Sequence, residues 1–409
     1  NLIQFTTNGI FMAHEKSDII VSVVIPVYNA GEYIADTLKN IVSQSLYEIE
    51  IIIINDHSSD NTLDILKEIA SSDERIRIID NAVNIGAGIS RNIGLSEAKG
   101  EYIIFLDDDD YVDTNMLKHM SDFAELSGAD IVVCRSRSFN LQSLQYAPMP
   151  DSIRKDLLPE KAVFSPGDIE RDFFRAFIWW PWDKLFRREF IIQHSLSYQD
   201  LRTSNDLFFV CASMLSAEKV TILDEILIAH TINRKTSLSS TRSVSYHCAL
   251  DALVALRDFL FKNGMMQKRQ RDFYNYIVVF LEWHLNTLSG EAFNKLFQDV
   301  KLFIRSFDIN NEDFYDEFIL SAYRRIADMY LFSLKDRVLN ELEDAQRNIL
   351  TLQNEVEEIK QQLQQKDEMI ASMNRENLAI KADNKILENY NEELKTVQTK
   401  FLKLLSSKD

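Results

Sequence analysis

The chain has 409 residues, 46% of them apolar, and carries a formal net charge of −18 with no basic arm. This composition can build a large hydrophobic core and disfavours nucleic acid or an anionic membrane as the main partner. Three widely spaced cysteines argue against a disulfide framework or a zinc site. The sequence shows no signal-peptide pattern and no apolar stretch long enough to span a membrane. Together these features predict a cytoplasmic protein without a transmembrane segment.

Residues 1–18 show no clear pattern and form an N-terminal extension in our interpretation. From 19 to 137, apolar runs alternate with segments whose apolar residues recur every three or four positions. This alternation predicts an α/β fold with a parallel, doubly wound sheet and a ligand site at the carboxyl ends of its strands. The predicted strands are 19–26, 49–54, 76–79, 102–106 and 131–133, and the predicted helices are 31–44, 62–71, 88–98 and 115–127.

The middle of the chain is less regular. Residues 135–166 are polar and predict a connecting segment, whereas 168–239 contain an aromatic cluster around Trp179, Trp180 and Trp182. These tryptophans are candidates for stacking on a ligand, although core packing is the expected role of at least two of them. Residues 241–334 are aromatic-rich and lack proline, which predicts a helical subdomain.

The last segment, 335–409, contains neither glycine nor proline. With Leu342 at position a, a heptad register continues for nine heptads and predicts a long C-terminal coiled coil. Asn377, Asn384 and Asn391 at position a favour a parallel homodimer, in which equivalent asparagines face each other. A single helix folded back on the globular part is the alternative.

Four consecutive acids, Asp107 to Asp110, directly follow the fourth predicted strand. Adjacent carboxylates at ~4 Å repel each other by about 1 kcal/mol per pair even in water. A hard divalent cation with oxygen ligands would relieve this repulsion. An acidic turn that caps the next helix explains the same residues, so the run alone leaves both interpretations open.

Other strand ends also carry polar groups. Asp56 ends the second strand, where it can accept a hydrogen bond from an N–H donor such as a uracil imide. Arg91 lies in the first turn of a helix, which is a favourable neighbour for a diphosphate. Taken singly, each segment also has a purely structural explanation as a turn or a helix cap.

Five motifs occur in order along the first half of the chain: Pro26-Val27-Tyr28-Asn29, Asn55-Asp56-His57-Ser58, Ser90-Arg91-Asn92, Gly100-Glu101-Tyr102 and Leu106-Asp107-Asp108-Asp109-Asp110. Together they resemble the family 2 glycosyltransferases of the GT-A fold. The resemblance covers residues 19–240 and implies a Rossmann-like nucleotide-sugar-binding domain with a donor half at 19–137 and an acceptor half at 138–240.

The resemblance implies a metal-dependent, inverting transfer of a sugar from a UDP-sugar to a hydroxyl of a glycan or glycoprotein, with Mn²⁺ or Mg²⁺ as cofactor. Asp109 would bind the metal with support from Asp107, and His230 is a candidate further ligand with a structural role as its alternative. The implied nucleotide-sugar-binding residues are Pro26, Val27, Tyr28, Asp56, Asn84, Arg91, Asp107 and Asp108.

The resemblance also implies a general base. The segment from Trp182 to Arg188 resembles one that precedes the base in this family, and we assign the base to Asp206, with Asn205 in place of the usual glutamate. Capping of the following helix is the alternative role of Asp206. Residues 232–239 resemble a loop that closes over the nucleotide.

By analogy, the enzyme would act in bacterial surface polysaccharide or glycoprotein biosynthesis, a role compatible with the inner face of the membrane. A second hypothesis is a coiled-coil scaffold that carries an inactive transferase-like domain; retention of the motif residues disfavours it. A third is a nucleotidyltransferase, but no glycine-rich phosphate loop with Arg and Lys appears near Pro26.

Overall fold

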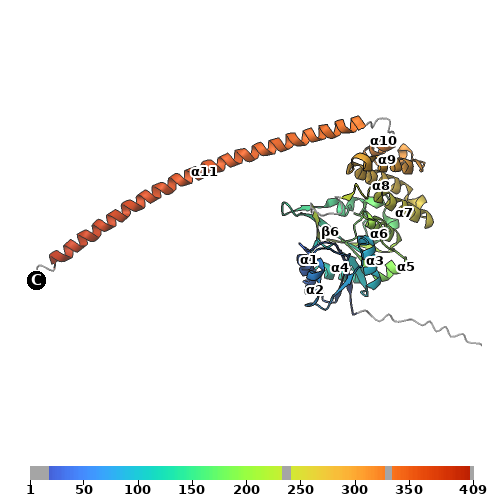
Figure 1. Ribbon diagram of the computed structural model, residues 1–409, viewed down its shortest axis with the longest axis horizontal. Coiled ribbons are helices and arrows are strands. Elements are labelled where there is room, and N and C mark those ends of the chain that lie inside the picture. Colours follow the sequence, from blue (N-terminus) through green and yellow to red (C-terminus); the bar gives the residue numbers. More distant parts are fainter. Residues whose placement is uncertain (1–17, 233–240, 328–333, 406–409) are drawn as a thin grey trace, which may run out of the picture. The chain divides into compact units, whose positions relative to one another are not determined.

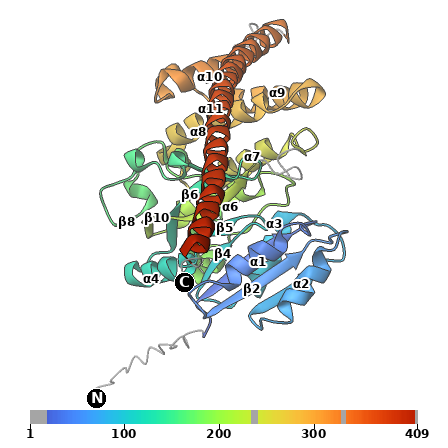
Figure 2. The same ribbon diagram turned by 90° about the vertical axis from the view of Figure 1, so that its left-hand side faces the viewer.

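The computed structural model describes residues 18–232, 241–327 and 334–405, and the side chains of the last range only in part. The chain divides into two compact units, 1–328 and 329–409, which are treated separately. The first unit contains a mixed sheet with helices on both faces, followed by a group of helices; the second is one long helix (Figures 1 and 2).

Four parallel strands form the first half of the sheet, in the order β3-β2-β1-β4. Their bounds are β1 Val21–Val27, β2 Ile49–Asn55, β3 Ile76–Asp80 and β4 Tyr102–Phe105. Every residue of β1, β2 and β4 is buried, which explains why their sequences are almost continuously apolar rather than alternating. These strands confirm the predicted ones to within two residues.

The expectation of a wholly parallel sheet is wrong. β9 (Lys184–Arg187) enters between β4 and β6 (Ile131–Asn140) and is antiparallel to both. Phe186 is fully buried at this junction, opposite Ile103 on one side and Ile131 on the other. Local periodicity cannot reveal such an insertion, because the three paired segments lie far apart in the sequence.

The other edge of the sheet is formed by β10 (Val220–Ile232) and β5 (Tyr111–Val112). β10 runs parallel to β6, and β8 (Val163–Phe164) pairs with its beginning. The segment predicted as irregular is partly a hairpin, since β6 continues into it and pairs with β7 (Gln145–Pro148). The prediction failed there because every residue of β7 is exposed and the strand shows no apolar pattern.

Helices cover both faces of the sheet. α1 (Ile34–Val42) and α4 (Met116–Ser127) pack on the face that holds Val23 and Ile51, whereas α3 (Ala87–Glu97) and α6 (Asn205–Ser216) pack on the other. Gly94 lets α3 approach closely, because a Cβ there would lie 2.3 Å from Val24 Cγ1. The remaining helices of this region are α2 (Thr62–Ala70) and α5 (Arg188–Gln193).

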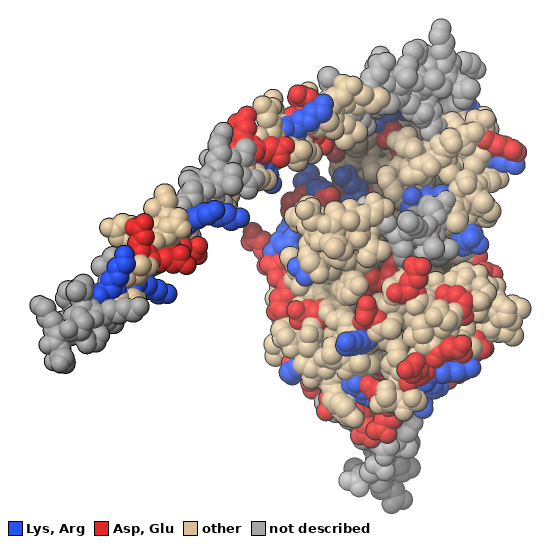
Figure 3. Space-filling view, turned by 60° about the vertical axis from the view of Figure 1, so that its left-hand side comes forward, with Lys and Arg blue, Asp and Glu red and all other residues tan. Residues whose placement is uncertain are grey.

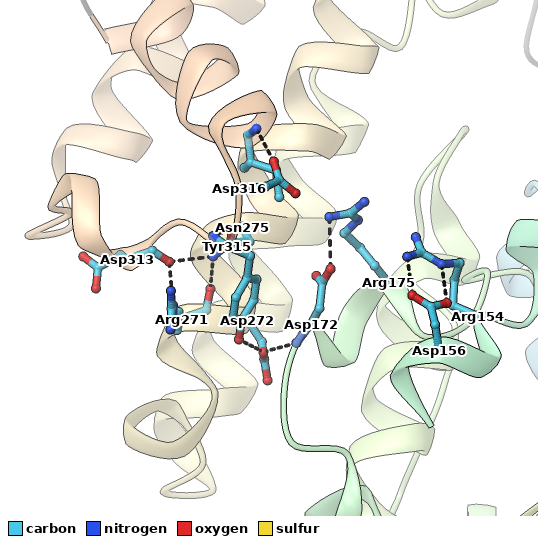
Figure 4. Close-up of polar contacts among 11 residues, drawn as sticks. Arg154, Asp156, Asp172, Arg175, Arg271, Asp272, Asn275, Asp313, Tyr315 and Asp316 are labelled. Atoms are coloured by element: carbon cyan, nitrogen blue, oxygen red, sulfur yellow. Dashed lines mark hydrogen bonds and ion pairs between the residues drawn. The ribbon is translucent and has the colours of Figure 1, made fainter. Parts of the chain in front are cut away.

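The predicted helical subdomain is present as α7 (Cys248–Lys262), α8 (Met266–Asn286), α9 (Gly290–Arg305) and α10 (Glu317–Ala327). A buried polar cluster ties it to the sheet domain (Figure 4). Asp272 of α8 accepts hydrogen bonds at 2.5 Å from the Asp172 backbone N–H and the Tyr315 hydroxyl. Burial raises the pKa of Asp172, and Asp272 raises it further while Arg175 opposes the shift.

The second unit is the continuous helix α11 (Leu334–Leu405). Its apolar a and d residues are exposed where they are described, including Ile349, Val356 and Leu363 at 50–61% exposure. Acidic and basic side chains follow one another along it (Figure 3). The structure thus confirms a long helix, while a coiled coil remains a prediction.

Among the described residues, no helix is long and apolar enough to cross a membrane.

Candidate active site

The predicted site residues gather where β1, β2 and β4 end. The strands are parallel and adjacent, so Tyr28, Asp56 and the acid run emerge at the same edge of the sheet. Val27 is buried in the core, whereas the Tyr28 ring is 46% exposed and its backbone N–H lies 3.5 Å from Asp108 Oδ2. Pro26 is also buried, so a ligand at this edge would meet the Tyr28 ring first.

Asp56 organises the loop before α3. Its carboxylate accepts hydrogen bonds from the backbone N–H groups of Ile85 at 2.9 Å and Gly86 at 2.8 Å, and from the Asn81 amide at 3.0 Å. Asn84 donates to the Asp56 backbone carbonyl. A carboxylate offers about four lone-pair sites, so three are used by the loop and about one is left for a ligand.

The four acids of the run differ in their surroundings. Asp107 is partly exposed and pairs with Arg91 at 2.6 Å, whereas Asp108 is buried. The backbone carbonyl of Asp109 accepts a hydrogen bond from the Thr231 hydroxyl at 2.5 Å. Asp110 is 1% exposed and accepts from the Thr231 backbone N–H at 2.9 Å. The run is therefore a structured turn held by β10 and not a row of equivalent solvated acids.

Asp110 also contacts His230 of β10, whose Nδ1 lies 2.9 Å from Asp110 Oδ1. Burial by itself would lower the pKa of His230, but Asp110, with Asp107 and Asp109, raises it to about 9. The His230 ring stacks on Trp182, with 5.0 Å between ring centroids. The imidazole is therefore fixed on one side by an aromatic ring and on another by a carboxylate.

Asp107, Asp110 and His230 can hold a metal ion, because ligand atoms of all three lie within 4.8 Å of one another. Oδ2 of Asp110 is buried and has no hydrogen-bond partner among the described residues, and coordination to a cation would satisfy this oxygen. Two carboxylates and one imidazole suit a divalent cation. The structure brings together two of the three predicted ligands, Asp107 and His230, and adds Asp110; Asp109 is not in this cluster.

Arg91 of α3 is buried and connects the acid run to α6. Its guanidinium donates to Asp107 at 2.6 Å and to the Asn205 side chain at 2.9 Å, and lies over the Tyr198 ring. Within the described parts of the chain, Nε of Arg91 has no hydrogen-bond partner. An unsatisfied buried donor is costly, so a polar ligand at this position would be favoured.

Asp206 stands at the start of α6, directly after Asn205. Burial raises its pKa to about 6; Arg91 opposes this shift and Asp107 adds to it. A carboxylate with a pKa near 6 is still largely ionised at neutral pH, and it is a stronger base than an ordinary aspartate. Its position near Arg91 and Asp107 therefore fits the predicted role of a general base.

A buried lysine supports the tryptophans beside His230. Lys184 is fully buried and donates from Nζ to the backbone carbonyls of Ile178 and Trp180, both at 2.8 Å, and to Asp183 at 2.6 Å. Trp180 and Trp182 pack against each other and against His230. Trp182 is buried in the core, as expected for at least two of the tryptophans, while Trp180 is partly buried.

Sequence reasoning missed the roles of Asp110 and Lys184. Asp110 belongs to the same acid run as the predicted ligands, and nothing local distinguished it from them. A charged pair, Asp183-Lys184, inside an otherwise apolar segment was the available signal for a buried lysine. The predicted closing loop spans 232–239, and its residues 233–239 lie outside the part of the chain that the structure describes.

Residues 22–194 match the Glycosyl transferase family 2 domain. The chain is 32% identical over 233 residues to the uncharacterized glycosyltransferase EpsJ of Bacillus subtilis. The match covers 57% of this chain and 65% of EpsJ, so this chain spans just under two thirds of the length of EpsJ. It is 30% identical over 271 residues to the cholesterol galactosyltransferase of Borreliella burgdorferi, covering 64% of this chain and 73% of that protein.

The fold is similar to that of S. aureus TarS 1–349, whose crystal structure was determined in complex with UDP-GlcNAc. The TM-score is 0.51 with 19% sequence identity, and the match covers 76% of this chain and 91% of that one. At this identity the likeness concerns the fold alone.

Proposed function

This chain belongs to glycosyl transferase family 2, and on that premise we propose that it is a metal-dependent inverting hexosyltransferase that uses a UDP-sugar. The acceptor would be a hydroxyl of a glycan or glycoprotein in bacterial surface polysaccharide or glycoprotein biosynthesis. The observation that carries the proposal is the convergence of the Asp107–Asp110–His230 cluster, Arg91 and Asp206 at the carboxyl edge of the sheet.

The donor would bind along the ends of β1 and β2. The exposed Tyr28 ring offers a face for the base, and the remaining acceptor capacity of Asp56 suits the imide N–H of uracil. Asn84 fixes the backbone carbonyl of Asp56, and Asp108 lies close to Tyr28, where a ribose would follow the base. The UDP-GlcNAc complex of TarS and the name of the galactosyltransferase relative support a UDP-linked hexose.

Mn²⁺ or Mg²⁺ bound at this edge would neutralise the charge that develops on the departing diphosphate. Asp107 and His230 are the ligands that sequence and geometry share, and the third ligand, a second carboxylate, would come from Asp110 or Asp109. The buried, unpartnered Oδ2 of Asp110 favours Asp110. Arg91 would donate from its Nε–H group to the diphosphate while a terminal nitrogen keeps Asp107 in place.

Asp206 would accept the proton of the acceptor hydroxyl as that oxygen attacks the anomeric carbon. The bond from this carbon to the diphosphate oxygen breaks on the opposite face, which inverts the configuration. UDP leaves with the electron pair of that bond, and Asp206 holds the proton until it is released to solvent. The raised pKa of Asp206 favours this proton transfer.

The alternative, an inactive transferase-like domain on a scaffold, is disfavoured by the integrity of the site. A domain that had lost catalysis would have no need to keep Asp206 at a raised pKa beside Arg91. A panel of UDP-sugars with Mn²⁺, read out as released UDP, tests the proposal. Turnover of one or more donors supports it, and no divalent-dependent turnover of any donor contradicts it.

We also propose that α11 pairs with α11 of a second copy as a parallel coiled coil. The exposed apolar a and d residues would be buried in this way, and a-position asparagines such as Asn384 and Asn391 would fix the register. A cytoplasmic location, compatible with work at the inner face of the membrane, is likewise our proposal; it rests on three cysteines that are all free and buried.

A further inference from the structure

A cleft of about 290 Å³ opens beside the active site at the edge of the sheet. Its walls come from β5, β6, β7 and β10, with Asn40 of α1 at one side. Tyr111 and Ala229, which are paired across β5 and β10, both line it. Each is one residue from the candidate metal site, since Asp110 precedes Tyr111 and His230 follows Ala229.

The cleft contains an arginine whose donors are not used by the protein. The Arg137 guanidinium lies 3.9 Å over the ring of Tyr146, and no hydrogen bond or ion pair of this side chain is found in the part of the chain that the structure describes. Phe139 packs against both Tyr146 and Tyr111, so the ring under the guanidinium is itself supported. Arg137 is exposed, and its five N–H donors are open to a ligand.

A second cleft on the molecule provides a comparison. It also contains a tyrosine and an arginine, Tyr47 and Arg75, with the guanidinium 4.8 Å from the ring. There, however, Arg75 pairs with Asp73 at 2.6 Å and donates to the Val42 carbonyl. Its donors serve the fold, whereas those of Arg137 do not.

The chemistry of the first cleft suits a sugar better than an anion. Asp113 and Thr114 line the same cleft, so hydrogen-bond acceptors face the ligand together with the guanidinium. The hydroxyls of a sugar both donate and accept, and its C–H groups can pack on the half-exposed Tyr146 ring. A phosphate or carboxylate would bind Arg137 but would be repelled by Asp113 and by the neighbouring acid run.

We propose that this cleft is a carbohydrate subsite that holds a sugar unit of the acceptor glycan at a distance from the unit that receives the transferred sugar. The link to the acceptor rests on the proposed function; the binding of a sugar does not. Ala229 of the cleft and His230 of the candidate metal site are adjacent in β10, about 3.3 Å apart along the strand, and their side chains point to opposite faces of the sheet. β5 is the edge strand, so a glycan that wraps around this edge would reach both.

Saturation-transfer NMR on the full chain tests the subsite, with the methyl glycosides of glucose, galactose, N-acetylglucosamine and rhamnose as probes. We expect saturation of at least one glycoside in the wild type. Arg137→Ala should weaken its binding about tenfold or more, because a charged hydrogen-bond partner is lost. Tyr146→Ala should weaken binding as well, and Tyr47→Ala, at the comparison cleft, should not. Thermal melting of each variant verifies that it folds.

Absence of saturation for all four glycosides in the wild type would overturn the subsite, as would undiminished binding in folded Arg137→Ala. Equal losses in Tyr47→Ala and Tyr146→Ala would also overturn it. The proposed function is judged separately, by release of UDP from UDP-sugars in the wild type. Release of UDP without binding of any glycoside refutes only the subsite, and binding without release refutes only the transferase.

Discussion

Arg91 donates a hydrogen bond to Asp107 at 2.6 Å, and its other terminal nitrogen donates to Asn205 at 2.9 Å. One guanidinium therefore holds together the acid run after β4 and the start of α6, which carries Asp206. The two partners lie 16 and 114 residues away from Arg91 in the sequence. Removal of this link should disturb the candidate metal site and the candidate base together.

Replacement of Arg91 by lysine tests this link. Lysine keeps the charge but cannot present two nitrogens to Asp107 and Asn205 at once. We expect Arg91→Lys to fold, to lose about 1–3 kcal/mol of unfolding free energy, and to lower UDP-sugar turnover by at least about tenfold. Turnover and thermal melting measure the two effects. Wild-type turnover in the lysine variant would show that Arg91 acts only as a charge.

Asp206→Asn should remove the general base of the transfer without removing contacts to the UDP-sugar donor. We expect UDP to bind as it does to the wild type, because Asp206 faces the acceptor side in our proposal, while transfer falls by about 10²–10⁴-fold. Calorimetric titration with UDP and Mn²⁺ separates binding from transfer. A collapse of UDP affinity would place Asp206 in the donor site instead.

The pKa of Asp206 predicts how transfer depends on pH. The carboxyl loses its proton as the pH rises through about 6, so transfer should increase up to that region and level off above it. A wild-type profile without this rise between pH 5 and 7 would contradict the assignment of the base, as would a rise that persists unchanged in Asp206→Asn.

The same pKa has a consequence for stability. The folded state holds the Asp206 proton more tightly than the unfolded chain, so the stabilisation from protonation is complete below about pH 4 and is lost as the pH rises to about 6. Asp206→Asn should therefore be more stable than the wild type at pH 7, by up to about 3 kcal/mol. Denaturant unfolding at pH 4 and pH 7 measures this, and we expect the difference to be largest at pH 7.

The third metal ligand can be decided by two matched variants. Asp110→Asn should weaken Mn²⁺ binding at least about tenfold if Oδ2 of Asp110 is a ligand, because an amide oxygen carries no charge. Asp109→Asn should have the same effect if the sequence-based assignment holds. Titration of Mn²⁺ by electron paramagnetic resonance gives the affinities. Unchanged Mn²⁺ affinity in both variants would refute a second carboxylate ligand from this run beside Asp107.

Truncation after Leu339 tests the proposed pairing of α11. The full chain should be a dimer by light scattering, because pairing buries the exposed row that includes Ile349, Val356 and Leu363. The truncated chain should be a monomer and should keep its UDP-sugar turnover, since the residues of the candidate site all precede α11. A monomeric full chain would contradict the parallel dimer.

The sequence by itself determined much of the fold. Buried parallel strands are apolar along their whole length and helices repeat their apolar positions every 3.6 residues, so β1 to β4 and α1 to α4 could be located from local patterns. The polar residues that end these strands, Asp56 and the acid run, could be assigned to one edge for the same reason. The long, proline-free pattern likewise predicted α11.

Only the tertiary structure decided which of those polar residues meet. β9 enters between β4 and β6, and Asp110 meets His230 from 120 residues away. Such contacts depend on how whole elements pack, and no local period in the sequence encodes them. Burial then gives otherwise similar acids different surroundings: Asp110 keeps an unpartnered oxygen beside His230, Asp107 pairs with Arg91, and Asp206 holds its proton up to about pH 6.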